Sequence, residues 1–137
     1  MALDLYGRYA LSYYILSTET AEVAIKAFER AFKVEPKVHP MIHTDRRATY
    51  CSVNFNDYLA SKNCVHSMSH PGHPWENSPM ERWWNDFKLI WLAKHPRPRT
   101  MAELDKLVQG AIEYFNTKRA YTTRNGLTAE QFRNQAA

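Results

Sequence analysis

The segment VHPMIHTD at residues 38–45 decides the fold class, because it joins a short apolar run to a carboxylate at its end. Val38–His43 is short and apolar and comes soon after Pro36, which favours a buried strand rather than a helix. Ligand sites in open α/β sheets collect outside the carboxyl ends of the strands. Asp45, which follows this strand, is therefore a candidate site residue.

Strand and helix signals alternate on both sides of this segment. Apolar side chains recur at helical spacing from Ala21 to Val34, after a capping threonine at Thr18 or Thr20. The remaining signals predict strands at 1–6, 10–16 and 64–68, helices at 54–62, 79–94, 100–119 and 128–134, and loops at 46–52 and 69–74. This order predicts one mixed α/β domain, with right-handed crossovers where parallel strands join.

The composition is that of an ordinary globular domain. The chain has 137 residues, of which 45% are hydrophobic and 23% charged, so intrinsic disorder is not expected. No apolar run approaches the ~20 residues that a membrane span needs, and no secretory signal opens the chain. Because Cys51 and Cys64 form no CxxC pair, we expect no disulfide framework and a cytoplasmic location.

Positive charge is concentrated in the second half of the chain. The net charge is −1 over residues 1–81 and +5 over residues 82–137, for a total of +4. A basic region of this kind favours a polyanionic partner, with nucleic acid as the first candidate. A solvated basic surface is the alternative.

A second carboxylate, Glu81, lies in the first turn of the helix predicted at 79–94. The helix dipole favours an ionised side chain there, although a glutamate at this position often does no more than compensate the dipole. Asn85 and Lys88 share the face of Glu81. The opposite face carries the predicted buried stripe of Met80, Trp84, Phe87 and Trp91.

The residues around these two carboxylates resemble the core of bacterial insertion-sequence transposases and retroviral integrases. His43–Tyr50 is similar to the pattern His-(Ser/Thr)-Asp-x-Gly-x-x-(Tyr/Phe), and Ser67–Glu81 to Ser-x-Ser-x-x-Gly-x-x-x-(Asp/Glu)-Asn-x-x-x-Glu. The family spacing of thirty-five residues between the acids separates Asp45 from Glu81. Two further segments match, because Asp4–Arg8 resembles Asp-Leu-Tyr-Ser-Arg and Tyr114–Arg119 resembles Tyr-Asn-x-x-Arg.

The resemblance implies a ribonuclease H-like fold, a mixed sheet flanked by helices, that cleaves phosphodiesters and transfers strands on DNA. In that family three acids hold two divalent metals, Mg²⁺ or Mn²⁺, and by motif position Asp45 is the second acid and Glu81 the third. The first acid lies on an opening strand that precedes the match to Asp4. We therefore expect residues 1–137 to be a partial catalytic-core domain, truncated at its N-terminus, in which Asp4 is a weak substitute. Whether the chain is an active enzyme stays open.

The resemblance also implies that Lys88 contacts DNA near the reacting phosphate. Arg82 and Arg119, in the basic half, are the other candidates for nucleic-acid binding. The expected partners are DNA and a second copy or a full-length transposase, with no membrane and no small-molecule substrate. The alternative is a non-catalytic remnant that binds DNA or a full-length transposase.

The chain departs from the family pattern at several positions. Arg47 stands in place of a glycine, and His70 and His73 stand in place of an arginine and an asparagine. Together with Cys64 and His66 these histidines could indicate zinc, but the spacing is no recognised zinc pattern. For His66, on an apolar strand, a hydrogen-bonded core histidine is the commoner interpretation.

Overall fold

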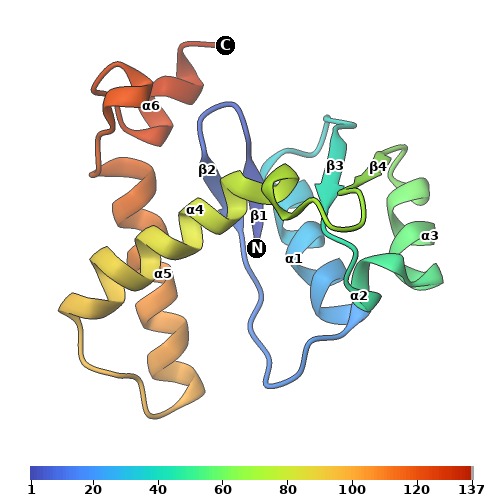
Figure 1. The fold of residues 1–137 in the computed structure, drawn as a ribbon, viewed down its shortest axis with the longest axis horizontal. Helices are drawn as coiled ribbons and strands as arrows, with labels where there is room; N and C mark the ends of the chain where they lie inside the picture. Colours follow the sequence, from blue (N-terminus) through green and yellow to red (C-terminus); the bar gives the residue numbers. More distant parts are fainter. Residues whose placement is uncertain (137) are drawn as a thin grey trace. The chain divides into compact units, whose positions relative to one another are not determined.

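The structure, a computed structural model, describes residues 1–136 and contains two compact units (Figure 1). The first unit comprises Met1–Ala2 and Leu11–Ser78, and the second comprises Leu3–Ala10 and the residues from Pro79 onward. At the N-terminus, β1 (Ala2–Asp4) pairs with β2 (Tyr9–Ser12). Both strands are shorter than the strands predicted at 1–6 and 10–16.

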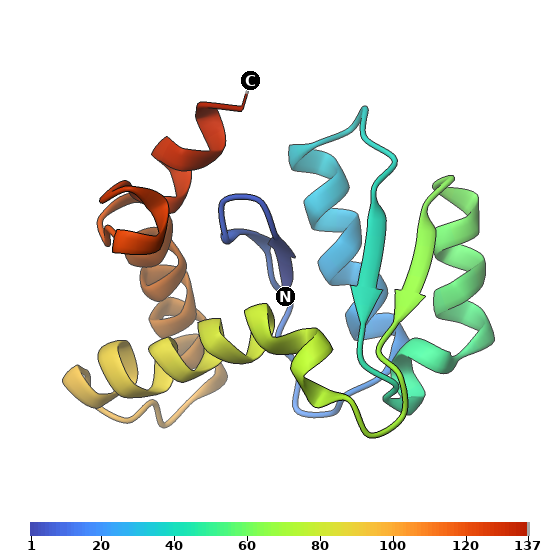
Figure 2. The same ribbon diagram turned by 45° about the horizontal axis from the view of Figure 1, so that its top comes forward.

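The first unit is built on two parallel strands, β3 (Met41–Thr44) and β4 (Val65–Met68), which lie side by side in Figure 2. Met41 lies opposite Val65 and Thr44 opposite Met68. Parallel neighbours need a long crossover. Here the crossover consists of α2 (Ala48–Cys51) and α3 (Val53–Ser61). The loop predicted at 46–52 is therefore wrong over one helical turn, which Arg47 precedes without a side-chain cap.

The helices of the first unit pack on an apolar cluster next to β3. Phe55 and Leu59 of α3 are 0% and 1% exposed, and they pack with Ile42 of β3 and Ala24 of α1 (Ala21–Val34). Both helices begin at capping hydroxyls. The Thr20 side chain accepts a hydrogen bond from a backbone N–H of α1, and that of Ser52 accepts one from α3, which satisfies otherwise unpaired donors.

The second unit consists mainly of helices. They are α4 (Ser78–Asp86), the π-helical turn η2 (Phe87–Trp91), the short η3 (Leu92–Lys94), α5 (Met101–Thr117), η4 (Thr122–Arg124) and α6 (Ala129–Asn134). The predicted helix at 79–94 thus changes its winding at Phe87. Between β4 and α4 the first unit ends in a loop and η1 (Pro74–Asn77). No helix within residues 1–136 combines the length and apolar character required to cross a membrane.

The buried side of α4 is centred one residue away from the predicted stripe. Trp83 is 6% exposed, whereas Trp84 is half-buried. The Trp83 ring stacks on Phe87 at 5.8 Å and meets the edge of Phe115 from α5 at 5.6 Å. Of the predicted stripe, Phe87 is buried as expected, whereas Trp83 rather than Trp84 is the buried tryptophan, because Trp83 makes the contact with α5.

A buried amide joins α5 to the N-terminal hairpin within the second unit. The Asn116 side chain accepts a hydrogen bond from the backbone N–H of Ala10 at 2.9 Å and donates one to its carbonyl at 3.0 Å. Asn116 therefore replaces the backbone partner that a neighbouring strand would give Ala10. This contact provides a physical reason for the asparagine in the segment Tyr114–Arg119.

Candidate functional site

Asp45 is positioned by β3, which ends one residue before it at Thr44. Its Oδ1 accepts a hydrogen bond from the backbone N–H of Arg47 at 3.1 Å, which turns the chain away from the strand. The prediction that Asp45 lies at the carboxyl end of a strand is confirmed. The carboxylate is partly exposed, so it is accessible to an ion from solvent.

The Asp45 carboxylate already has a cationic neighbour. Arg47 Nε lies 3.2 Å from Asp45 Oδ2, and Arg47 Nη1 lies 3.2 Å from an oxygen of Glu19. Hydrogen bonding to Glu19, together with the charges of both acids, raises the pKa of Arg47. A divalent ion at Asp45 would compete with this guanidinium, which stands where the resembling family has a glycine.

Glu81 lies in the first turn of α4, as predicted, and its side chain is exposed. Among residues 1–136 the Glu81 side chain forms no hydrogen bond and no ion pair. Its oxygens are therefore available to a ligand without the loss of an existing contact. In this respect it differs from Asp45.

Asp45 belongs to the first unit and Glu81 to the second. The expectation that the two carboxylates approach closely enough to share a cation therefore stays a prediction. Each offers oxygen donors, the kind of ligand that Mg²⁺ prefers. The donor chemistry of both residues fits the implied metal.

Asp4 forms the same two kinds of contact as Asp45, one with an arginine and one with a backbone N–H. Its Oδ2 lies 2.6 Å from Arg133 Nε, and its Oδ1 accepts a hydrogen bond from the backbone N–H of Tyr6 at 3.1 Å. Both partners belong to the second unit, as Asp4 does. These contacts support a structural role for Asp4 in the N-terminal turn.

The three predicted nucleic-acid-binding residues differ in availability. Lys88 in η2 is exposed, and its side chain has no hydrogen bond or ion pair in the described part of the chain. Arg82 pairs with Asp86 at 3.3 Å. Arg119 is half-buried, and its guanidinium lies 5.0 Å from the centre of the Tyr121 ring. Lys88 is thus the most readily available phosphate contact of the three.

A network of histidines and hydroxyls joins the ends of β3 and β4. His43 Nδ1 lies 3.0 Å from Ser67 Oγ, and His43 Nε2 lies 3.0 Å from Ser69 Oγ. Arg46 Nε donates to the Ser69 carbonyl at 2.7 Å. Sequence reasoning did not assign a role to these serines. Their alternate spacing beside a histidine on the neighbouring strand is the signal that could have found them.

His66 confirms the interpretation as a hydrogen-bonded core histidine. Its Nδ1 lies 2.7 Å from Asn56 Oδ1 and its Nε2 lies 2.9 Å from Thr44 Oγ1. Burial, and secondly the nearby His43, lowers the pKa of His66. Both effects favour the neutral form of the ring beside the strand that leads to Asp45.

Two family descriptions match most of the chain. Residues 1–74 match a family described as Integrase core domain, and residues 62–128 match a second family of the same description. InsK for insertion sequence element IS150 of Escherichia coli (strain K12) is 26% identical over 136 residues, covering 97% of this chain and 47% of InsK. The transposase InsF for insertion sequence IS3fB of the same strain is 26% identical over 137 residues, covering 98% and 47%. The chain thus spans about half the length of these relatives.

Solved structures show the same fold. The catalytic core domain of HTLV-2 integrase, in complex with magnesium in a dimeric form, superposes with a TM-score of 0.66 at 22% identity, covering 95% of this chain and 79% of that one. The catalytic core domain of BIV integrase gives a TM-score of 0.66 at 16% identity, covering 88% and 75%. These likenesses confirm the ribonuclease H-like fold. The chain belongs to the integrase core domain family, that of the DDE transposases and integrases.

Proposed function

We propose that this chain is the core of a DNA transposase that carries out metal-dependent phosphodiester cleavage and strand transfer, with Asp45 and Glu81 as two of the metal ligands. The observation that supports the proposal is the position of the two acids, because Asp45 follows β3 and Glu81 lies in the first turn of α4, each within a stretch that resembles an integrase core domain. Mg²⁺ or Mn²⁺ would serve as the cofactor. Two such ions activate the attacking oxygen and stabilise the leaving oxygen in this type of reaction.

Asp45, Glu81 and Lys88 would have different roles, according to the contacts that each already makes. Asp45 would exchange its contact with Arg47 for the ion, whereas Glu81 would bind without losing a partner. Lys88, free of ion pairs within residues 1–136, would hold a DNA phosphate on the exposed side of its helix. We further propose that the chain acts on DNA in the cytoplasm, together with a second copy or a full-length transposase.

Mn²⁺ binding tests the metal site directly. We expect Asp45→Asn and Glu81→Gln each to weaken Mn²⁺ binding at least tenfold, measured from the electron paramagnetic resonance signal of the free ion. The matched control is Asp57→Asn, because Asp57 is an exposed carboxylate on α3 and should leave binding unchanged.

The double variant decides whether the two carboxylates share one ion. If they do, Glu81→Gln should add little to the loss already caused by Asp45→Asn, since the two effects are coupled. Additive losses would mean two separate sites and would contradict the proposal.

By motif position the chain carries two of the three acids, so we expect little nicking of supercoiled DNA by this chain alone. Robust nicking that Glu81→Gln abolishes would contradict this expectation.

DNA binding tests the role of Lys88. If Lys88 binds a phosphate, Lys88→Ala should weaken binding to all duplex sequences alike and reduce the salt slope by about one counterion. The control is Lys26→Ala on α1, where the ammonium already pairs with Glu22 at 2.8 Å. Equal salt slopes for Lys88→Ala and the unmodified chain would show that Lys88 is only a surface residue.

A further inference from the structure

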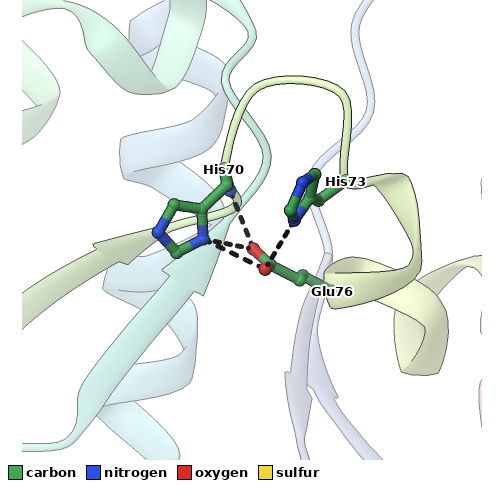
Figure 3. A group of neighbouring side chains, drawn as sticks. All are labelled: His70, His73 and Glu76. Carbon is green, nitrogen blue, oxygen red and sulfur yellow. Dashed lines mark hydrogen bonds and ion pairs between the residues drawn. The ribbon is translucent and has the colours of Figure 1, made fainter.

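The loop between β4 and α4 brings two histidines and a glutamate together, as Figure 3 shows. His70 Nδ1 lies 3.0 Å from Glu76 Oε1, and His73 Nδ1 lies 3.3 Å from the same oxygen. One ligand atom from each of the three side chains lies within 4.8 Å of the other two. All three residues belong to the first unit, so their arrangement is internal to that unit.

The backbone of the loop builds this cluster. The N–H of His73 donates to the His70 carbonyl at 3.1 Å and closes a tight turn, in which Gly72 adopts a positive φ of 78° that favours glycine. The N–H of Glu76 then donates to the His73 carbonyl at 3.2 Å in the first turn of η1. Two successive turns thus hold the three side chains on the same side of the loop.

Further contacts orient the individual ligand groups. The backbone N–H of His70 donates to Glu76 Oε2 at 2.7 Å, which leaves Oε1 directed at both imidazoles. This hydrogen bond, followed by that from the His70 ring, lowers the pKa of Glu76 to about 2. The His73 ring stacks on Trp75 at 4.6 Å. Such supporting contacts fix the orientation of ligands in protein metal sites.

We propose that His70, His73 and Glu76 bind a Zn²⁺ ion through two imidazole nitrogens and one carboxylate oxygen. Neighbouring ligand atoms of a tetrahedral zinc site lie about 3.4 Å apart, given bonds of about 2.0–2.2 Å. The distances of 3.0 and 3.3 Å are already close to this spacing. Three protein ligands leave the fourth position to water, and the ion takes the place of the protons now shared between the rings and the carboxylate.

The donor set separates this site from the one at Asp45 and Glu81, and the zinc proposal does not depend on the proposed function. Imidazole nitrogen suits zinc and other transition metals, whereas Mg²⁺ prefers oxygen alone. Only Glu76 matches an acid of the transposase pattern. His70 and His73 are departures from it, so the site is a feature that this chain adds to the common core.

The structure also corrects the zinc pattern considered from the sequence. Cys64 and His66 are not part of the cluster, because His66 is hydrogen-bonded to Asn56 and Thr44. Glu76, which the sequence pattern had not included, takes their place. The reason is local, because the turn at Gly72 brings residues from three to six positions apart together, while β4 carries the earlier residues away.

Zinc titration of the full chain, in competition with a chromophoric chelator, tests the proposal. We expect one Zn²⁺ per chain, and at least a tenfold loss of affinity in His70→Arg and in His73→Asn, which restore the family's residues. Glu76→Gln should lose affinity as well, although its amide oxygen can still accept the His70 N–H. Co²⁺ should give the intense visible bands of tetrahedral coordination in the unmodified chain and not in these variants.

Matched controls make the result decisive. His39→Asn and His95→Asn replace exposed histidines outside the cluster, and Cys51→Ser removes an exposed thiol, so all three should bind Zn²⁺ as the unmodified chain does. Asp45→Asn should also keep its Zn²⁺ affinity, which distinguishes this site from the proposed Mg²⁺ site. Unchanged Zn²⁺ affinity in His70→Arg and His73→Asn, or an equal loss in the controls, would overturn the proposal. Circular dichroism of each variant confirms that it is folded.

Discussion

The loop after β3 and the start of α4 carry the two acids of one family motif, but the surroundings of the two carboxylates differ. Asp45 in the first unit lies 3.2 Å from the Arg47 guanidinium, whereas Glu81 in the second is exposed and forms no ion pair among residues 1–136. A motif therefore fixes where a carboxylate lies along an element. The residues around the carboxylate determine whether a ligand must displace an existing contact in order to bind it.

The same two units also differ in how they are held together. The first unit packs its helices on β3 through an apolar cluster whose most buried side chain is Phe55. The second unit combines aromatic contacts around Trp83 with the paired amide of Asn116. The two contacts to compare are therefore the apolar burial of Phe55 in the first unit and the buried pair of hydrogen bonds of Asn116 in the second.

The largest expected effect comes from Phe55→Ala. Removal of a fully buried phenylalanine costs about 3–5 kcal/mol of the free energy of unfolding, through lost burial and the cavity left behind. Urea denaturation measures this loss. Hydrogen exchange would show faster exchange in α1 and α3 than in α5, and equal acceleration in all three helices would mean that the two units unfold together.

Asn116→Ala should cause the next largest loss of stability. The substitution leaves the buried N–H and carbonyl of Ala10 without a hydrogen-bond partner. This costs about 2–4 kcal/mol of the free energy of unfolding. Thermal unfolding measures the loss. Asn85→Ala, on the exposed side of α4, is the control and should change stability by less than about 0.5 kcal/mol. A small effect of Asn116→Ala would remove the contrast between the units.

A smaller effect is expected from pH at His66. Burial lowers its pKa in the folded chain, so as the pH falls through about 6.5 the unfolded chain takes up a proton that the folded chain does not. Stability should therefore decrease from pH 7.5 to 5 and level off below the folded pKa. His66→Gln should lose less stability over this interval, measured by urea denaturation at each pH, while His39→Gln should behave like the unmodified chain.

The smallest expected effect concerns Arg47. Exposed ion pairs contribute about 0.2–1 kcal/mol, so Arg47→Gly should strengthen Mg²⁺ binding at Asp45 by no more than about fivefold. Calorimetric titration measures the change, and Arg47→Lys, which keeps the charge, should show less of it. Weaker Mg²⁺ binding in Arg47→Gly would mean that the guanidinium supports the carboxylate rather than blocking it.

Much of the fold could be predicted because local signals agree with it. The helix at 21–34 was predicted with its observed bounds, since an amphipathic pattern follows a capping threonine. The strand at 65–68 lies within the apolar run that predicted it, whereas the strand at 41–44 begins three residues after the start of the predicted run at 38–43 and ends one residue beyond it. The turn of helix at 48–51 was missed, because Arg47 before it provides no side-chain cap and a single turn is too short to show helical periodicity.

The candidate site was predictable in position but not in its contacts. The apolar run at 38–43 placed Asp45 after a strand and the helical periodicity at 79–94 placed Glu81 in a first helical turn, and both placements are confirmed. The pairing of Arg47 with Glu19 joins residues that are 28 positions apart in sequence, so no local pattern indicates it. Likewise, the cluster of His70, His73 and Glu76 depends on two consecutive turns whose geometry the sequence does not specify.

The wider turn at η2 sets the direction in which the side chain at its end, Trp91, leaves the helix. It directs the Trp91 indole so that Nε1 donates to the Leu107 carbonyl at 2.9 Å, while a Cβ at Gly110 would lie only 3.0 Å from the ring. Deletion of one residue between Phe87 and Trp91 would rotate that indole by about 100°. The rotation would remove both the hydrogen bond to Leu107 and the close approach of the ring to Gly110. Related chains should therefore vary in residue type at the exposed Leu89 but keep the number of residues in this turn.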